Sequence, residues 1–144
     1  MLELAFDWRG VMTPEQRATV LARPEVAHYI DGWGRRGDLG VVADNGAPLG
    51  AAWIRRFTRH DPGYGYVDDE TPELSIGVVE DQRGRGLGTA MLHALVERAL
   101  GEGATRMSLS VEDENPARRL YERLGFDVVG RVGSSDTMIL TLRG

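Results

Sequence analysis

A glycine-rich stretch over residues 82–90 carries the residue types best suited to hold a phosphate group. Its three glycines stand at alternate positions, which lets the backbone turn tightly and bring its amides close to a ligand. Apolar residues recur at helical spacing from Leu87 to Leu100, so these amides should lie at a helix N-terminus, where unpaired N–H groups and the helix dipole attract an anion. Two arginines add positive charge. The predicted pyrophosphate site consists of Arg83, Gly84, Arg85, Gly86, Leu87, Gly88 and Thr89.

Three known glycine loops can be compared with this stretch. A P-loop ends in Gly-Lys-Ser or Gly-Lys-Thr, and no lysine follows here. The dinucleotide pattern G-x-G-x-x-G fails because Thr89 or Met91 occupies its last position, and the acidic residue expected about 20 positions later is missing. The pattern R/Q-x-x-G-x-G/A is matched from Arg83 to Gly88. In this respect the stretch resembles the acetyl-CoA loop of the GNAT superfamily of N-acetyltransferases.

Length and composition narrow the class of protein. The 144 residues are enough for one domain, expected to span 1–144. The net charge is −5, from 17 Lys and Arg against 22 Asp and Glu, so neither nucleic acid nor an anionic membrane is an expected partner. The chain has no cysteine, which excludes disulfides, thiolate metal sites and an acyl-cysteine intermediate. His28, His60 and His93 lack metal-ligand spacing, so no metal is expected.

The N-terminal residues mix charges into a short apolar run and show no cleavage pattern of a signal peptide. No apolar run is long enough to cross a membrane. A cytoplasmic location is therefore expected.

Helical and strand patterns alternate along the chain. Helices are expected over Thr13–Leu21, with Thr13 as N-cap, over Pro24–Ile30 and over Leu87–Leu100. Strands are expected over Leu39–Ala43, Leu49–Phe57, Leu74–Val79, Arg106–Val111, Phe126–Val132 and Thr137–Leu142. Leu2–Phe6 should form only a stub of a first strand, and residues 58–71 a loop rich in glycine, proline, tyrosine and aspartate.

A second motif specifies both ends of a short helix. Asn115 suits the N-cap, Pro116 the first helical position and Gly125 the left-handed residue after the end. Four apolar positions at i, i+3, i+4 and i+7 form one buried stripe that includes Tyr121. The run Asn-Pro-Ala-Arg-Arg-Leu-Tyr-Glu-Arg-Leu-Gly-Phe closely resembles the N-x-x-A-x-x-L-Y-x-x-x-G-F segment of bacterial GNAT acetyltransferases. Asn115 precedes Tyr121 by six residues, whereas many relatives have seven, which is compatible with a helix start shifted by one.

The resemblance implies an α/β fold, with a mixed, mostly antiparallel sheet that splays open at the acetyl-CoA site and is flanked by helices. Acetyl-CoA would be the co-substrate, with its pyrophosphate in the glycine loop. The strand residues Ile76, Gly77 and Val78 would pair with the pantetheine amides like an added strand, and a backbone N–H near Val78 would polarise the thioester oxygen. Asn115 is also assigned to cofactor binding.

Acetyl transfer to an amine requires a base for the amine and an acid for the departing thiolate. Tyr121 is the candidate acid, because it occupies the position of the family's tyrosine and a phenol can return a proton to a thiolate. Glu73 is the candidate base by comparison with relatives that keep a glutamate on this strand. Without a catalytic role, Tyr121 would be a tyrosine of the core and Glu73 a solvated glutamate at the end of a strand. A carboxylate that some relatives acting on protein N-termini carry before the second helix is absent, since Leu109 or Ser110 stands there.

The predicted function is transfer of an acetyl group to a primary amine by direct attack in a ternary complex. The acceptor would be a small molecule or a peptide, so a peptide or protein N-terminal acetyltransferase is an alternative within the same class. A non-catalytic acyl-CoA-binding module and a nucleotide-binding regulator are alternatives from other classes. Tyr64 and Tyr66 are candidates for the acceptor pocket. The strand expected near the C-terminus is compatible with a homodimer.

Overall fold

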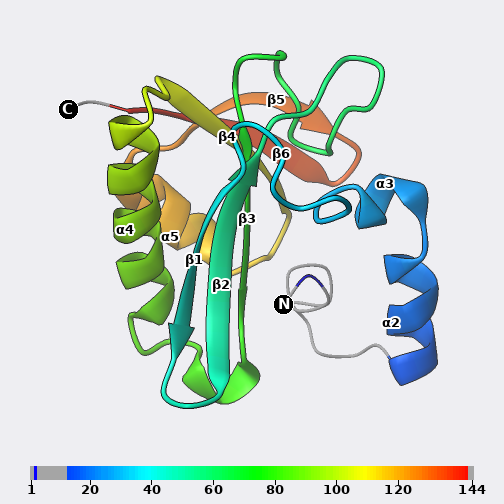
Figure 1. Ribbon diagram of the computed structural model, residues 1–144, viewed down its shortest axis with the longest axis vertical. Coiled ribbons are helices and arrows are strands. Elements are labelled where there is room, and N and C mark those ends of the chain that lie inside the picture. The colour runs from blue at the N-terminus through cyan, green and yellow to red at the C-terminus, as the bar shows by residue number, and fades with distance from the viewer. Residues whose placement is uncertain (1, 3–12, 143–144) are drawn as a thin grey trace.

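The computed structural model describes residue 2 and residues 13–142 (Figure 1). Six strands form one sheet in the order β1-β2-β3-β4-β6-β5. Their bounds are β1 (Leu39–Asp44), β2 (Pro48–Arg55), β3 (Glu73–Val78), β4 (Arg106–Glu112), β5 (Asp127–Val132) and β6 (Ser135–Thr141). All neighbours are antiparallel except β3 and β4, which are parallel. The predicted mixed, mostly antiparallel sheet is therefore confirmed.

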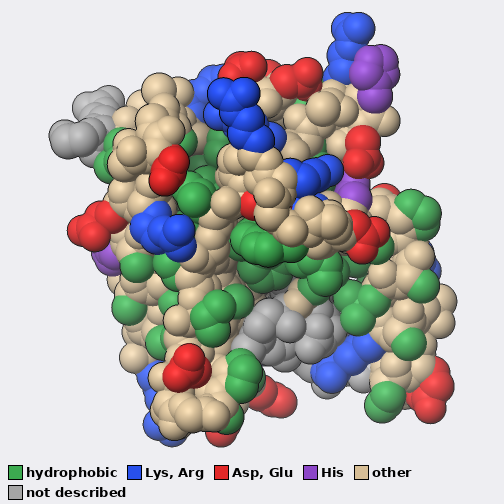
Figure 2. Space-filling model, viewed as in Figure 1, with side chains coloured by type: hydrophobic (Ala, Val, Ile, Leu, Met, Phe, Trp, Pro, Cys, Tyr) green, Lys and Arg blue, Asp and Glu red, His purple; other side chains and the backbone are tan. Residues whose placement is uncertain are grey.

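The helices are α2 (Pro14–Leu21), α3 (Pro24–Ala27), α4 (Leu87–Gly101) and α5 (Ala117–Leu124), with a 3₁₀ turn η1 (Glu80–Gln82) before the glycine loop. None of the helices described is long and apolar enough to cross a membrane. Figure 1 shows α4 and α5 on one side of the strands β1 to β3, and α2 and α3 on the other. On the face drawn in Figure 2, acidic and basic side chains of the described residues are interspersed.

Most predicted elements are present, with some shifted ends. The helix from Thr13 has the predicted cap, because the Thr13 side chain accepts the amide of Gln16 while the Gln16 side chain accepts that of Thr13. The helix predicted over Pro24–Ile30 ends at Ala27 and continues only as turns. The predicted stub at Leu2–Phe6 lies, apart from Leu2, outside the described residues.

The helix expected to be capped by Asn115 begins one residue later, at Ala117, with Pro116 in the cap position. The Asn115 side chain still accepts the backbone amide of Ala117 at 3.0 Å, so it fulfils the predicted capping role in part. Gly125 has the expected left-handed conformation, with φ of 101°.

Strand β2 separates two apolar clusters, because successive side chains of a strand point to opposite faces. Ala52 and Ile54 pack in the main core with α4, the end of α5 and β6. Trp53, between them, packs in the second cluster with Val26 and Phe57 on the side of α2 and α3. Both sides of the sheet are thus covered, and β3 is held beside β2 by antiparallel pairing from Glu73 to Val78.

The sheet is open between β3 and β4. One residue pair, Glu73 with Ser108, joins these two parallel strands, and the Ser108 amide donates to Pro72 O at 2.9 Å. By contrast, β4 pairs with β6 along its whole length. Since β3 and β4 start together and then diverge, a wedge-shaped gap lies beyond Glu73, as the predicted splayed sheet requires.

A buried arginine fixes the loop between α3 and β1. The side chains of Arg55 and Asp38 are almost fully buried, and the Arg55 guanidinium makes two hydrogen bonds to the Asp38 carboxylate, at 2.8 and 3.0 Å. A third nitrogen, Nη1, donates to the carbonyls of His28 and Asp31. Burial opposes ionisation of Asp38, but its hydrogen bonds from Arg55 and from backbone amides prevail and hold its pKa below the usual value. These bonds engage the carbonyls just after α3, which explains why that helix stops.

Replacing Asp38 by alanine should lower the free energy of unfolding by about 3–5 kcal/mol, because it leaves the Arg55 charge buried without its partner. Urea denaturation at neutral pH followed by circular dichroism measures this loss. Glu70→Ala is the matched control, since Glu70 pairs with Arg56 at 3.8 Å on the surface and should contribute less than about 1 kcal/mol. Equal effects of the two substitutions would contradict this account of the buried pair.

Candidate active site

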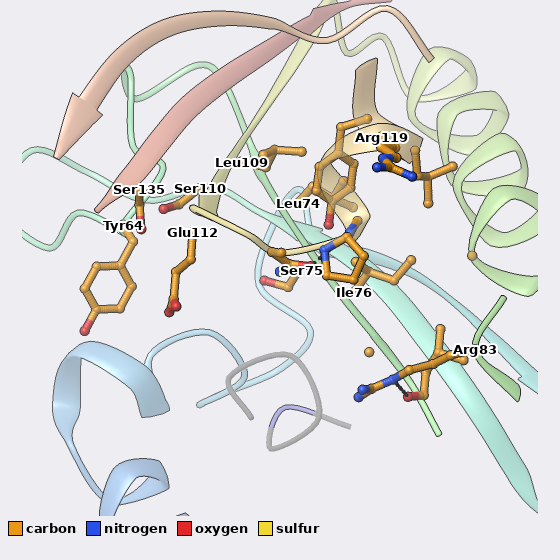
Figure 3. Close-up of a pocket in the computed structure, with 18 of the residues that line it drawn as sticks. Tyr64, Leu74, Ser75, Ile76, Arg83, Leu109, Ser110, Glu112, Arg119 and Ser135 are labelled. Carbon is orange, nitrogen blue, oxygen red and sulfur yellow. Dashed lines mark hydrogen bonds between the residues drawn. The ribbon is translucent and has the colours of Figure 1, made fainter. Parts of the chain in front are cut away.

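A cleft of about 890 Å³ occupies the gap between β3 and β4 and continues between α5, the glycine loop and the α2–α3 region. Figure 3 shows its two ends. Tyr64, Ser110, Glu112 and Ser135 lie together at one end, and Arg83 lies at the other, with the β3 residues between them. The first group is called here the acceptor end and the second the loop end.

The edge of β3 that faces the cleft has peptide groups available for a ligand. The Val79 amide donates to Leu49 O beside β2, and Pro72 O accepts from β4. Because the peptide groups of successive strand residues point to alternate sides, those of Leu74, Ile76 and Val78 point toward the cleft. The Arg83 side chain bonds Val78 O at 3.2 Å (Figure 3). An extended chain with amide groups could therefore pair with this edge as an additional strand.

The glycine loop has the conformation that its sequence predicts. Gly84 and Gly86 have φ of 76° and 80°, in the left-handed region that favours glycine, and a Cβ on either would meet no atom within 4 Å. Gly86 is the N-cap of α4, and the amide of Ala90 bonds back to Gly86 O. The three preceding amides, of residues 87–89, are thus at the helix N-terminus, where an anion is stabilised.

The structure brings nearly all of the predicted site residues to this one cleft. Those that line it are Glu73, Ile76, Gly77, Val78, Arg83, Gly84, Gly86, Gly88, Thr89, Asn115 and Tyr121. Two predicted residues do not. The Leu87 side chain packs against the main core, and Arg85 is exposed outside the lining. Leu87 can therefore contribute its backbone amide only, and Arg85 only long-range charge.

Tyr121 is both a core residue and a cleft residue. The residue is 6% exposed, and its ring packs against Phe126, with ring centroids 5.6 Å apart. The residue also lines the cleft, and its hydroxyl has no hydrogen-bond partner among the described residues. Burial raises the pKa of this phenol above its usual value. The hydroxyl therefore stays protonated at neutral pH, as a general acid must be before it acts.

Glu73 is not a solvated glutamate at the end of a strand, the alternative to a catalytic role, because it is only 3% exposed. One carboxylate oxygen, Oε1, accepts the Gly65 amide at 2.9 Å, and the other, Oε2, accepts the Tyr29 hydroxyl. Burial, partly offset by these two hydrogen bonds, raises the pKa of Glu73 to about 7. A carboxyl with such a pKa can take up a proton near neutral pH, which is the property of a general base.

Sequence reasoning did not find Tyr29, which lies 44 residues before Glu73 in the chain. It also missed Gly63, which lies against the same carboxylate, and Gly65, whose amide donates to it. No local pattern marks these contacts, because they depend on packing of the 58–71 loop over β3. Of the two tyrosines expected near the acceptor, Tyr64 lines the cleft, whereas the Tyr66 hydroxyl donates to Asp69 outside it.

Comparison with known proteins gives relatives that are acetyltransferases. The chain is 39% identical over 80 residues to mycothiol acetyltransferase of Corynebacterium aurimucosum, covering 55% of this chain and 24% of that protein. It is 44% identical over 63 residues to L-methionine sulfoximine/L-methionine sulfone acetyltransferase of Pseudomonas paraeruginosa, covering 43% of this chain and 37% of that protein. The chain therefore spans less than two fifths of the length of either relative.

A solved structure of yncA from Salmonella typhimurium, with its cofactor acetyl-CoA, is 28% identical. It superposes with a TM-score of 0.61 over 75% of this chain and 66% of that one. The model of the acetyltransferase (GNAT) family matches residues 5–126, which include the glycine loop, Glu73 and Tyr121. With a matching family model, a splayed sheet and both predicted motifs on one cleft, the chain belongs to the acetyltransferase (GNAT) family.

Proposed function

We propose that the protein is an acetyl-CoA-dependent N-acetyltransferase that acetylates a primary amine by direct attack in a ternary complex. The observation that carries the proposal is the set of groups that line the cleft between β3 and β4. Amides of a helix N-terminus, the edge of β3 beyond its pair with β4, a buried carboxylate and a buried phenol all line it. These are the groups required to bind a nucleotide thioester, to deprotonate an amine and to protonate a thiolate.

The donor set fits acetyl-CoA. Backbone amides of residues 87–89, with Arg83 beside them, would hold a pyrophosphate through hydrogen bonds and charge. The peptide groups of Leu74, Ile76 and Val78 would pair with the amides of an extended pantetheine arm. When bound, acetyl-CoA supplies the acetyl group as a thioester.

Glu73 would accept a proton from the ammonium group of the bound substrate, either directly or through one water molecule, and so leave a neutral amine that can attack. An aliphatic amine is mostly protonated at pH 7, so this step is required before its nitrogen can bond to the acetyl carbon. The neutral nitrogen then bonds to the acetyl carbon, and Tyr121 would donate its hydroxyl proton to the sulfur as the C–S bond breaks. The second nitrogen proton, lost as the amide forms, restores the phenol through solvent, and Glu73 returns its proton to solvent. The Val78 amide, which points into the gap, would stabilise charge on the carbonyl oxygen.

The two named relatives support a small-molecule acceptor. One is a mycothiol acetyltransferase and the other an L-methionine sulfoximine/L-methionine sulfone acetyltransferase. The test is acetyl transfer measured by thiol release, with purified protein and a panel of amino acids, amino sugars, polyamines and short peptides. Turnover of a small amine above the peptides would support the proposal. Absence of turnover with the whole panel, despite acetyl-CoA binding, would favour the non-catalytic binding module.

Tyr121→Phe should lower kcat by about 10²-fold or more while leaving the Kd for acetyl-CoA within about twofold of wild type, because a general acid acts in the transition state and not in binding. Steady-state kinetics and isothermal titration measure the two quantities. Tyr66→Phe is the control, since its hydroxyl bonds Asp69 away from the cleft. A Tyr121→Phe enzyme with normal kcat would remove Tyr121 from the mechanism.

A further inference from the structure

Both oxygens of the Glu73 carboxylate are held by donors from other parts of the chain. Oε1 accepts the Gly65 amide, and Oε2 accepts the hydroxyl of Tyr29. The Tyr29 oxygen itself accepts the amide of Tyr64 at 2.7 Å. A phenol has one proton to donate, and here that proton is directed at Glu73 because the Tyr64 amide occupies the acceptor side of the oxygen.

The loop that supplies these amides approaches Glu73 closely because two of its residues are glycines. A Cβ at Gly63 would lie 2.2 Å from Glu73 Oε1 and 2.9 Å from the Tyr29 hydroxyl oxygen. A Cβ at Gly65 would lie 2.5 Å from the carbonyl carbon of Leu109 on β4. The Gly63-Tyr64-Gly65 segment therefore fills the narrow start of the gap between β3 and β4 and encloses the carboxylate.

Tyr29 is fixed independently of Glu73. Its side chain is buried in the second apolar cluster, and its ring contacts those of His28 and Phe57, with centroids 4.8 and 5.0 Å away. Its carbonyl accepts the Trp53 indole N–H at 3.2 Å. The Tyr64 ring stacks on it at 6.4 Å and 14°, at the acceptor end of the cleft. A hydroxyl on so restricted a ring has a defined position before any ligand binds.

We propose that Tyr29 is a positioning residue for the reaction, whose hydroxyl holds the Glu73 carboxylate toward the acceptor end of the cleft in its proton-accepting form. The inference rests on the proposed function, in which Glu73 is the base. Tyr29 also lines the cleft, so the same hydroxyl borders the place where the amine would enter.

The surroundings of Glu73 make the role of Tyr29 measurable. Of the described groups packed against Glu73, Tyr29 is the titratable one that bonds it, while Arg55, its cross-strand neighbour on β2, directs its guanidinium to Asp38. Burial raises the pKa of Glu73, and the hydrogen bonds from Tyr29 and Gly65 lower it. Burial and the adjacent carboxylate also raise the pKa of Tyr29, so it remains a donor throughout the neutral range. Loss of the Tyr29 hydroxyl should therefore raise the pKa of Glu73 further.

The experiment compares wild type with Tyr29→Phe by two readouts. The first is a titration of the Glu73 side-chain carboxyl by ¹³C NMR in the ligand-free protein, assigned with Glu73→Gln. We expect the midpoint to move up by about half a unit or more in Tyr29→Phe. The second is the pH profile of kcat/KM, whose acidic limb should move by the same amount. A shift of one unit corresponds to a tenfold loss of rate on that limb.

A merely structural role of Tyr29 would lower kcat/KM at every pH and leave both midpoints unchanged, which would overturn the inference. Tyr66→Phe, with its hydroxyl outside the cleft, is the matched control and should shift neither. Tyr29→Phe keeps the ring that packs against His28 and Phe57, so the variant should fold, and circular dichroism before the titration verifies this.

The outcomes separate this inference from the proposed function. If Glu73→Gln retains full activity with an unchanged acidic limb, Glu73 is not the base and both fail. If Glu73→Gln abolishes the acidic limb of the kcat/KM profile while Tyr29→Phe leaves the Glu73 midpoint in place, the role of Glu73 as base is supported and the positioning role of Tyr29 is overturned. A shifted midpoint in the NMR titration together with a shifted limb supports both.

Discussion

Replacing Gly86 by glutamate is expected to weaken acetyl-CoA binding by at least about 100-fold. The substitution places a carboxylate beside the amides of the α4 N-terminus, where the pyrophosphate is proposed to lie, and like charges in contact cost several kcal/mol. Space is not the obstacle, since a Cβ at Gly86 meets no atom within 4 Å. The loss of acetyl-CoA affinity should therefore come mainly from charge repulsion. Isothermal titration with acetyl-CoA at low salt measures it.

Gly46→Glu is the matched control for this variant. Gly46 also has a left-handed φ, of 106°, with no atom within 4 Å of a Cβ, but it lies in the turn between β1 and β2. Both substitutions carry a similar conformational cost of about 1–2 kcal/mol. If binding falls equally in the two variants, the loss reflects stability and the anion site at Gly86 is wrong. If Gly86→Glu binds normally, the proposed location of the pyrophosphate is wrong.

Glu73→Gln is expected to lower kcat/KM for amine acetylation by about 10²–10⁴-fold at pH 8, the range typical of a general base. With a Glu73 pKa of about 7, the wild-type rate should fall tenfold per pH unit below that value, because the protonated carboxyl cannot accept a proton. Initial rates between pH 5.5 and 9 measure both effects. Glu97→Gln, at an exposed position of α4 outside the cleft lining, should change neither.

The same variant should remain folded, which makes its loss of activity interpretable. The pKa of Glu73 is higher in the folded protein than its value of 4.5 in an unfolded chain, so the folded state holds the proton more tightly. The corresponding stability is fully present below pH 4.5 and is lost as the pH rises through about 7. Glutamine has no such titration, so Glu73→Gln should be as stable as wild type, or more so, at pH 8. A large loss of stability in urea denaturation at that pH would contradict this.

The elements of the fold and the conformation of the glycine loop could be predicted because their signals are local. Thr13 and Gln16 cap a helix through contacts three residues apart, and the left-handed conformations of Gly84, Gly86 and Gly125 depend on the absence of a Cβ at those positions. The second motif likewise specifies its own helix, apart from the shift of its first residue to Ala117. Local hydrogen bonds and steric limits act on any chain with this order of residues.

Only tertiary packing decided the environment of Glu73 and the end of α3. Both depend on contacts between distant segments: Tyr29 and Gly65 meet at the Glu73 carboxylate, and Arg55 binds carbonyls of the chain after α3. The sequence by itself therefore determined the secondary structure and the glycine loop, whose interactions lie within a few residues. The chemical state of the candidate base was decided by burial and by donors from distant segments, and these exist only once the loop has packed over the strand.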